Sequence, residues 1–316
     1  MRFFIFKILF LMVFNIKAQD IHFSQFNVSN SFLDPSIIGT QSGDFRVSFQ
    51  KRTQWQAVAY PFNTIAANFA VKNIIDNSSL ELQFFNDVAG DSYITTSQFS
   101  ASINRNFSIN LEENFSLGLS LGIAQRGVDF TNLIFEEYED LKNISFRYFD
   151  LGIGANYSIT KLEGINFIFG LSAFHINKPR QSLIKENDVN LEEKYNLYYK
   201  SFFSISNNIN VNPALIYTSQ GKSKELIFGS EIDLKIVNSN IDIVSQIFYR
   251  LNDAFIPAVG INYQNIKVIV SYDINVSDLA IASYNKGGFE FSIIYNWNKK
   301  KNNKEQETIE CCPMYL

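Results

Sequence analysis

Hydrophobic and polar residues alternate with a period of two along most of the 316-residue chain. Such a period places successive side chains on opposite faces of a β-strand. The alternation is clearest in the last two stretches, which start at Ile266 and Phe289 and flank a polar loop at 275–286. These stretches predict an antiparallel hairpin, which needs neighbouring strands of the same kind to be stable. In the second stretch, one face carries the bulky residues Phe289, Phe291, Ile293, Tyr295 and Trp297.

Strand-like stretches of this kind occupy almost the whole chain. Counting alternating runs bounded by turn residues gives about fourteen strands, and no helical pattern of comparable length competes. The least ambiguous runs are 115–123 and 149–159, in which apolar residues alternate mainly with Gly, Ser, Asn and Asp. The predicted strands begin near Phe45, Phe62, Leu80, Tyr93, Phe115, Phe149, Ile165, Tyr199, Val211, Leu226, Ile241, Val259, Ile266 and Phe289.

The length and the two faces of these strands favour a membrane barrel over a soluble sandwich. They approach the roughly 9 to 11 residues that a tilted transmembrane strand needs. Unpaired backbone groups are costly in hydrocarbon, so strands are stable there only in a closed barrel. The polar faces suit a wet or polar lumen. We predict an all-β fold, a closed antiparallel transmembrane β-barrel of about 14 strands, with interfacial aromatic residues at Tyr157, Phe167, Tyr249, Tyr263 and Trp297.

The two ends of the chain do not alternate. Arg2 and Lys7 lead into a short apolar core, and Ala18 is a suitable small residue before a signal-peptide cleavage site. The core is too short to span a bilayer as a helix. We expect a signal peptide at 1–18, an N-terminal periplasmic or plug segment at 19–43, the outer-membrane β-barrel at 44–298 and a polar periplasmic tail at 299–316.

Connection lengths indicate how the barrel is oriented in the membrane. An even number of strands brings both chain ends to one side, and outward loops are usually longer than periplasmic turns. The two longest predicted connections, about 124–144 and about 177–197, are the fifth and seventh, whereas 207–210 and 264–265 are even-numbered and short. We therefore expect contact with outer-membrane lipid in a Gram-negative bacterium, with both termini periplasmic.

Composition argues against several kinds of partner. A net charge of -4 gives no basis for nucleic-acid binding. Cys311 and Cys312 are adjacent, so no disulfide framework is available, and without a nearby histidine they form a weak metal-ligand pair. We expect no cofactor. A basic run follows the last predicted strand and consists of Lys299, Lys300, Lys301 and Lys304. Such a run either docks on an acidic partner or, more commonly, is solvated beyond the membrane.

Candidate catalytic and metal-binding residues are few. The parity of His175 matches that of Phe169 and Leu171, which predicts a place on the lipid face near a strand end. The alternative is a Ser/His/Asp hydrolase site inside the barrel, but the second histidine, His22, lies in a separate region. We predict that the protein is not an enzyme. An acidic cluster without the spacing of a calcium loop favours a solvated outer loop over a Ca²⁺ site: Glu136, Glu137, Glu139 and Asp140.

Short motifs stand at both ends of the chain. The N-terminal ones are Gln19-Asp20-Ile21-His22-Phe23-Ser24-Gln25, Asp34-Pro35-Ser36 with Gly39, Arg52-Thr53-Gln54-Trp55 and Pro61-Phe62-Asn63-Thr64. The C-terminal ones are Ser271-Tyr272-Asp273-Ile274-Asn275-Val276-Ser277 with Leu279, Gly287-Gly288-Phe289-Glu290, Ile294-Tyr295 and Cys312-Pro313. This arrangement resembles the PorP/SprF family of type IX secretion membrane proteins. It departs from the family pattern at Ile21, Asp34 and Ser36, where Pro, Asn and Ala are usual.

The resemblance implies a barrel that works with type IX secretion components, and with gliding motility in bacteria that have it. Family members are implied to support secretion or surface attachment of adhesin cargo with a C-terminal sorting domain. The alternative is a general or substrate-specific porin or transporter. Our candidate partner-docking or family-motif residues are Phe23, Ser24, Gln25, Pro35, Gly39, Gln54, Trp55, Pro61, Tyr272, Asp273, Asn275, Gly287, Gly288 and Glu290.

Closure of the barrel predicts that motifs from the two chain ends meet, because the first strand must pair with the last. We predict that the resulting feature supports docking of machinery or cargo; the alternative is that the motifs only shape the seam. The loops Glu136–Asp140 and Asn187–Glu193 are expected to adjust the choice of cargo. The predicted seam feature comprises Gln54, Trp55, Pro61, Asp273, Asn275 and Gly288.

Overall fold

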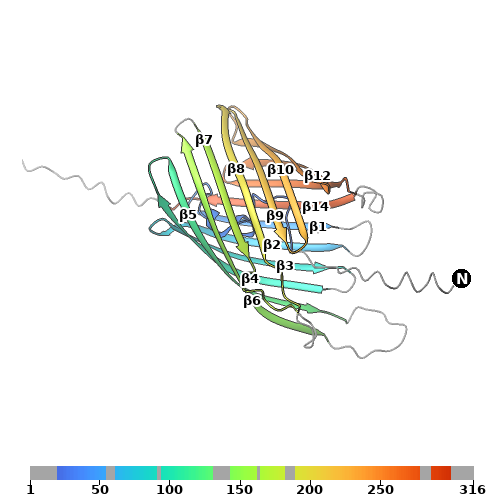
Figure 1. Ribbon diagram of the computed structural model, residues 1–316. Coiled ribbons are helices and arrows are strands. Elements are labelled where there is room, and N and C mark those ends of the chain that lie inside the picture. Colours follow the sequence, from blue (N-terminus) through green and yellow to red (C-terminus); the bar gives the residue numbers. More distant parts are fainter. Residues whose placement is uncertain are drawn as a thin grey trace, which may run out of the picture.

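The computed structural model describes residues 20–54, 61–90, 94–130, 143–161, 164–181, 189–277 and 286–299. Within them, fourteen antiparallel strands form one sheet that closes on itself (Figure 1). The strands are β1 (Phe45–Gln54), β2 (Phe62–Ile75), β3 (Ser78–Ala89), β4 (Ile94–Ser108), β5 (Glu113–Val128), β6 (Ile144–Lys161), β7 (Ile165–Phe174), β8 (Lys194–Ser206), β9 (Ile209–Gln220), β10 (Ser223–Lys235), β11 (Ile241–Arg250), β12 (Ala254–Tyr263), β13 (Ile266–Asn275) and β14 (Lys286–Trp297). Two short 3-10 helices precede them, η1 (Asn30–Phe32) and η2 (Pro35–Ile37). In this described part of the chain, no helix is long and apolar enough to cross a membrane.

Each strand pairs with its sequence neighbours, and β1 pairs with β14 to close the barrel. The closing register runs from Phe45 opposite Trp297 to Gln54 opposite Gly288. The predicted closed antiparallel barrel is confirmed. Three strands begin before the predicted residue: at Ile144 instead of Phe149, at Lys194 instead of Tyr199 and at Ala254 instead of Val259.

The outer face of the barrel is apolar, as the alternation predicted. On β5, Leu119 and Ile123 are 42% and 54% exposed, whereas Ser116 and Ser120 on the opposite face are 4% and 8% exposed. In a membrane the exposed side chains contact lipid, and burial of their apolar surface there is favourable. The inner faces instead contact other parts of the chain, which fill much of the barrel.

The apolar belt ends at a row of polar side chains on β3 to β6. Asn86, Ser97, Gln125 and Arg147 are direct cross-strand neighbours on the outer face. Asn86 Nδ2 donates to Ser97 Oγ at 2.7 Å, and Arg147 Nε donates to Gln125 Oε1 at 3.2 Å. These two hydrogen bonds give partners to polar groups at this edge of the apolar belt. Two residues further along each strand, toward the middle of the barrel, the outer face is apolar and carries Phe84, Phe99, Ile123 and Phe149.

Aromatic rings mark the opposite end of the belt. Trp297 stacks on Phe45 and Tyr295, with ring centroids 5.2 and 5.1 Å apart, and lies 6.4 Å from Phe69. A girdle of aromatic side chains is typical of the boundary between lipid and water. The predicted interfacial position of Trp297 therefore agrees with its place at the end of β14.

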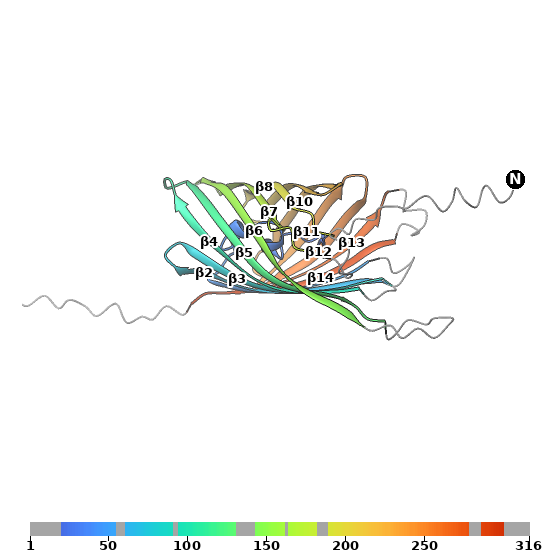
Figure 2. The same ribbon diagram turned by 60° about the horizontal axis from the view of Figure 1, so that its bottom comes forward.

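The two mouths of the barrel differ in their connections (Figures 1 and 2). Odd-numbered connections open at one end, which we call the long-loop mouth, and they include those between β5 and β6 (129–143) and between β7 and β8 (175–193). Even-numbered connections open at the other end, the short-turn mouth, and include 207–208 and 264–265. The two long connections thus lie at the same mouth, as their odd numbers predicted.

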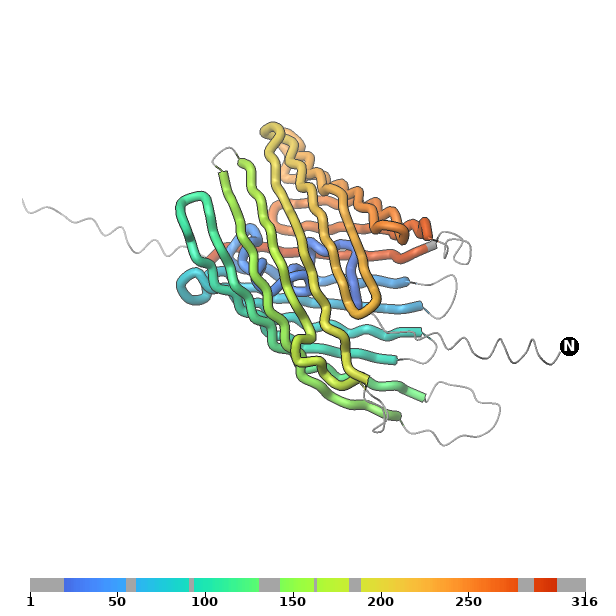
Figure 3. The backbone as a smooth tube through the Cα atoms, viewed as in Figure 1, coloured from blue at the N-terminus to red at the C-terminus, as the bar shows by residue number. Residues whose placement is uncertain are grey.

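Residues 20–43, which we call the lumenal segment, run inside the barrel from one mouth to the other (Figure 3). The Asp20 amide donates to Gln220 Oε1 at 3.0 Å at the long-loop mouth. The Asp44 amide donates to the Trp297 carbonyl at 3.0 Å at the short-turn mouth. Both termini were expected on one side. That is wrong for the described ends, because the lumenal segment carries Asp20 to the mouth opposite Lys299.

Candidate functional site in the barrel lumen

The lumenal segment contains one tight turn that its sequence dictates. Asp34 caps η2: its carboxylate accepts from Ser36 N and from Ser36 Oγ, both at 2.7 Å. Asp is a preferred N-cap residue, and Pro35 suits the first helical position because its missing N–H needs no partner there. Gly39 follows with a φ of 85°, a conformation that glycine adopts without strain. Contacts within the segment therefore define the shape of this turn, independently of the barrel wall.

The first anchor of the lumenal segment joins the closing strands. The backbone amides of Ser24 and Gln25 donate to the two carboxylate oxygens of Glu290, at 2.8 and 2.9 Å. Ser24 Oγ donates to Asp273 Oδ1 at 2.8 Å. Arg52 forms ion pairs with Asp273 at 2.7 Å and with Glu290 at 3.0 Å. Strands β1, β13 and β14 thus hold the segment at the seam where the barrel closes.

Arg250 on β11 completes this group. Its Nη2 donates to Ser24 Oγ at 2.9 Å, its Nη1 lies 3.2 Å from Asp273 Oδ2, and its Nε lies 3.1 Å from Glu225 Oε2. Removing one partner from a buried ion pair costs about 3 to 5 kcal/mol, because a charge is left uncompensated. We call the group that comprises Ser24, Gln25, Arg52, Arg250, Asp273 and Glu290 the seam network.

The backbone around the seam network leaves no room for larger residues at Gly287. A Cβ atom there would lie 2.3 Å from the carbonyl oxygen of Asp273, next to a register shift between Tyr272 and Ile274. At Gly288 a Cβ would be 3.3 Å from Gln54 Cγ and 3.4 Å from Arg52 Nη2. Gly287 therefore allows β14 to approach the bulged β13, and Gly288 lies close to side chains of β1.

The second anchor holds the Asp34 turn against β4 to β8. Asn104 Nδ2 donates to the Ser36 carbonyl at 3.0 Å, Asn156 Nδ2 donates to Ser36 Oγ at 2.8 Å, and Tyr198 Oη donates to Asp34 Oδ2 at 2.7 Å. A Cβ atom on Gly154 would lie 1.8 Å from Asp34 Oδ1. Glycine on the inner face of β6 is thus required by the close approach of the turn.

The third anchor fixes the start of the segment. His175 Nε2 lies 2.6 Å from Asp20 Oδ2, and its Nδ1 lies 2.8 Å from Asp150 Oδ1. Burial lowers the pKa of His175, but the two carboxylates more than offset this effect and raise it to about 9. The same charge on His175 outweighs burial at Asp20 and holds the pKa of that carboxyl well below its usual range. At neutral pH this anchor is an imidazolium between two carboxylates.

The prediction that His175 faces lipid is wrong. Strand β7 ends at Phe174, and His175 has a φ of 58°, so the strand parity does not continue to it. The residue is 5% exposed, and its side chain points to Asp20 and Asp150. Because both ring nitrogens face carboxylates, His175 has no free nitrogen with which to activate a serine hydroxyl.

The convergence of Ser24, Asp273 and Glu290 links the motifs from both chain ends. The chain matches the family described as type IX secretion system membrane protein PorP/SprF over residues 15–295. It belongs to this family. None of the curated proteins compared with the chain matches it. Family membership and the barrel together indicate an outer-membrane protein associated with type IX secretion. The PorP/SprF family consists of non-enzymatic membrane proteins.

Solved structures of outer-membrane barrels are similar to this PorP/SprF protein in fold. The Ralstonia pickettii toluene transporter TbuX has a TM-score of 0.52 at 8% identity, over 83% of this chain and 91% of that chain. The monoaromatic hydrocarbon channel CymD has a TM-score of 0.52 at 7% identity, over 86% of this chain and 93% of that chain. At these identities the similarity concerns the fold alone.

The remaining family-motif residues of this PorP/SprF protein take different positions. Phe23 packs inside the barrel against Ala66 and Phe85. Tyr272 is 39% exposed on the outer face. The other members lie along the seam or near it: Gln54 is the cross-strand neighbour of both Gly288 and Phe62, Asn275 is opposite Ala254, and the Pro61 carbonyl accepts from Asn63 Nδ2 at 3.4 Å.

Several predicted features lie outside the described residues. They are the signal peptide at 1–18, Gln19, Trp55, the acidic cluster at Glu136–Asp140, the first part of the Asn187–Glu193 loop, Leu279, Lys300, Lys301, Lys304, Cys311 and Cys312. Among the described residues, no group of three His, Cys, Asp or Glu side chains could hold a metal ion.

Sequence reasoning missed part of the seam network. Arg52 belongs to a quoted motif but was not chosen as a site residue, and Arg250 belongs to no motif. The available signal was their parity: Arg250 shares its strand face with Gln246, and a charged residue on an inner barrel face needs a partner. Gln50 was also missed; its Nε2 donates to the Gln25 carbonyl and to Glu290 Oε1, both at 3.1 Å.

Proposed function

We propose that this PorP/SprF barrel supports the secretion or surface attachment of adhesins that carry a C-terminal sorting domain, and gliding motility where cells move in this way. The observation that carries the proposal is the family match combined with the seam network, where motifs from both chain ends meet. The barrel lies with its long-loop mouth outward and with Lys299 and the tail in the periplasm.

We assign different roles to the outward and inward residues of the seam. Tyr272 points outward, whereas its neighbour Asp273 is 2% exposed and contacts the lumenal segment. Outward motif residues such as Tyr272 dock machinery or cargo, together with Trp55. Asp273 and Glu290 act indirectly, because they hold the segment that fills the lumen. The loops Glu136–Asp140 and Asn187–Glu193 adjust the choice of cargo.

The alternative function is that of a porin or transporter, and the occupied lumen counts against an open, general porin. Three anchors hold the lumenal segment across the barrel, and most of their side chains are buried. A liposome-swelling assay tests the alternative. The intact protein is expected to pass no sugars, and free passage of sugars would favour the porin.

The deciding experiment uses a deletion strain complemented with Tyr272→Ala or Asp273→Ala. Barrel level in the outer membrane is measured together with one surface adhesin in the medium, on the cell and in the periplasm. We expect Tyr272→Ala to lower adhesin display at a normal barrel level, because it removes an outward aromatic side chain without touching the lumen. Phe289→Leu, at the cross-strand neighbour of Tyr272, is the matched control. Normal display of every cargo in the full deletion would refute the proposed function.

A further inference from the structure

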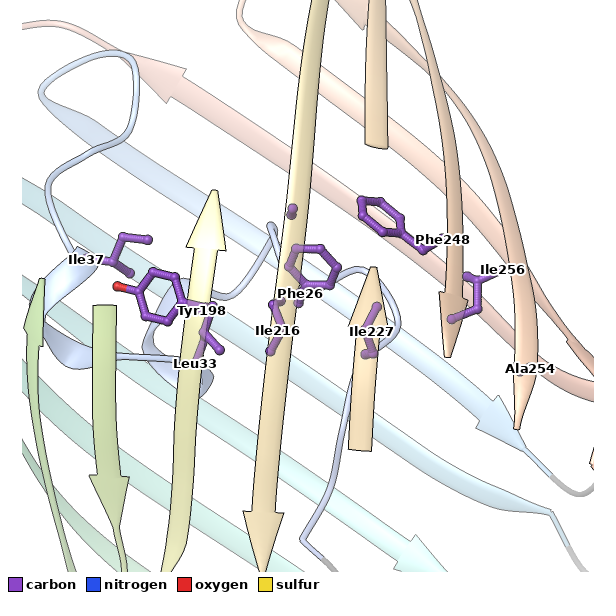
Figure 4. Close-up of a cluster of buried hydrophobic side chains, with 10 residues drawn as sticks. Phe26, Leu33, Ile37, Tyr198, Ile216, Ile227, Phe248, Ala254 and Ile256 are labelled. Carbon is purple, nitrogen blue, oxygen red and sulfur yellow. The ribbon is translucent and has the colours of Figure 1, made fainter. Parts of the chain in front are cut away.

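A cavity of about 80 Å³ lies between the lumenal segment and the wall formed by β8, β9 and β10. Its apolar part is lined by Phe26 and Leu33 from the segment and by Ile216 and Ile227 from the wall. These side chains belong to one cluster of buried apolar residues (Figure 4). The cavity is thus a place where the segment and an apolar wall do not pack completely.

The charged groups around the cavity already have partners within the protein. Lys194 Nζ lies 3.9 Å from Asp20 Oδ2, and Glu225 Oε2 lies 3.1 Å from Arg250 Nε. His22 also lines the cavity; burial and the nearby Arg250 guanidinium hold its pKa well below its usual range, so it is neutral at pH 7. An ionic ligand would have to break an existing pair or remain uncompensated. The site therefore favours a neutral ligand.

The volume of the cavity sets the size of the group that it accepts. An apolar cavity of about 150 Å³ binds benzene and stays free of water. A cavity of about 80 Å³ has about half that volume, so it accepts a small aliphatic group and is too small for an aromatic ring. Filling it removes apolar surface from water, which is favourable and roughly proportional to the area covered.

We propose that this cavity is a binding site for a neutral, branched aliphatic group of the size of a leucine or isoleucine side chain. The site goes beyond the proposed role in secretion and does not depend on it. Such a group comes either from an aliphatic residue of a polypeptide at the long-loop mouth or from a free small molecule. Both sources share the same chemistry, so the experiment uses one probe of each kind.

The test is a titration of the full mature chain in lipid nanodiscs, with isoleucine methyl groups labelled for NMR. Isobutanol represents the free molecule, and the capped peptide acetyl-Gly-Leu-Gly-amide represents the polypeptide. We expect saturable shifts of the Ile216 and Ile227 methyl signals with at least one probe. Ile243 and Ile261, which are exposed on the lipid face, report partition into the bilayer and are expected to remain unchanged. Isobutylammonium has the same shape with a charge and is expected to bind at least tenfold more weakly.

Variants that fill the cavity give the second arm. Ile216→Phe, followed through the Ile227 methyl signal, is expected to weaken binding at least tenfold, and Ile227→Phe, followed through Ile216, provides an independent variant. Ile243→Phe on the lipid face is the matched control and is expected to bind like the unaltered chain. Saturation by the peptide alone identifies a polypeptide source, and saturation by isobutanol alone identifies a free molecule. The proposal is overturned if neither probe saturates, if lipid-facing methyl signals shift equally, or if both filled variants bind normally.

Discussion

The two halves of the lumen wall hold the lumenal segment in different ways. On the wall formed by β1 to β3, small polar side chains contact serines of the segment: Asn68 Nδ2 donates to Ser29 Oγ, and Gln83 Nε2 donates to Ser31 Oγ, both at 2.7 Å. On the wall formed by β8 to β12, the segment meets an apolar surface that contains Ile216, Ile227, Phe248, Ala254 and Ile256 (Figure 4).

This difference separates the contacts that set the register of the segment from those that only favour its burial. Hydrogen bonds are directional, so the polar half fixes which residue of the segment lies at which strand. Apolar burial is not directional, so the apolar surface of the other half favours occupation of the lumen without setting the register. On that half the register depends on separate hydrogen bonds, such as that from Tyr198 to Asp34. The cavity lies on the apolar half, and incomplete packing in its apolar part, around Ile216 and Ile227, breaks no hydrogen bond. A gap on the polar half would leave an unsatisfied polar group, at a cost of about 1 to 3 kcal/mol.

The largest effect is expected from Glu290→Ala in the seam network. The substitution leaves Arg52 without one of its carboxylates and removes the acceptor of two backbone amides, so we expect a loss of about 3 to 5 kcal/mol. The midpoint of urea unfolding, followed by the gel mobility of the folded barrel, measures the loss. Lys51→Ala, on the outer face of the same seam, is the control and is expected to change the midpoint little.

A double variant sharpens this prediction. Arg52→Leu combined with Glu290→Leu removes both members of an ion pair, so the combined loss is expected to be smaller than the sum of the two single losses. Strict additivity would show that Arg52 and Glu290 do not stabilise each other. The seam network would then not be the anchor that we infer from its 3.0 Å contact.

A smaller effect is expected where the segment approaches the backbone of β6. In Gly154→Ala, the new Cβ atom would lie 1.8 Å from Asp34 Oδ1, so the capped turn must move, at a cost of about 1 to 3 kcal/mol. Gly122→Ala is the matched control, because its Cβ would meet the flexible end of Gln98 instead. Thermal unfolding of the two variants measures the difference. Equal melting temperatures would contradict the close approach of the Asp34 turn.

The third anchor predicts a dependence on pH. The pKa of His175 is about 9 in the folded protein and 6.5 ordinarily, so the folded state binds the proton more tightly. The resulting stabilisation is complete below pH 6.5 and is lost as the pH rises through 9. We expect His175→Gln to lower the urea midpoint at pH 6 and to leave it nearly unchanged at pH 10. His22→Gln, at a histidine that is neutral at both values, is the control; an equal pH dependence in the two variants would refute the assignment.

The sequence predicts the fold well because lipid imposes one rule on every outward position. Phe289, Ile293 and Tyr295 are exposed as their parity predicts. The inner faces follow no single rule. Ile269 and Ile294 interrupt the polar face of the predicted hairpin, and they are 1% and 5% exposed inside the barrel. These exceptions were the available signal that the lumen is packed and partly apolar, whereas the polar faces alone had suggested a wet lumen.

The site is less predictable, because its contacts join strands that are distant in the chain. Family motifs indicated Ser24, Asp273 and Glu290, and closure of the barrel indicated that they meet. Neither consideration indicates Arg250, since its contact with Ser24 depends on how the lumenal segment crosses the barrel. His175 failed for a local reason: parity applies only while a strand continues, and β7 ends one residue earlier. Docking by the outward residues stays a prediction.

The smallest expected effect lies on the apolar half. Ile256→Val removes one methylene from a fully buried side chain in the cluster that contacts Phe26, and a substitution of this kind typically costs about 0.5 to 1.5 kcal/mol. Because no hydrogen bond changes, the register of the segment should stay intact. Protection of the Gln25 amide from hydrogen exchange reports the register, because this amide donates to Glu290. Unchanged protection with a slightly lower unfolding midpoint is expected. Faster exchange at Gln25 would show that the apolar half also sets the register, and the division of labour between the two halves would then fail.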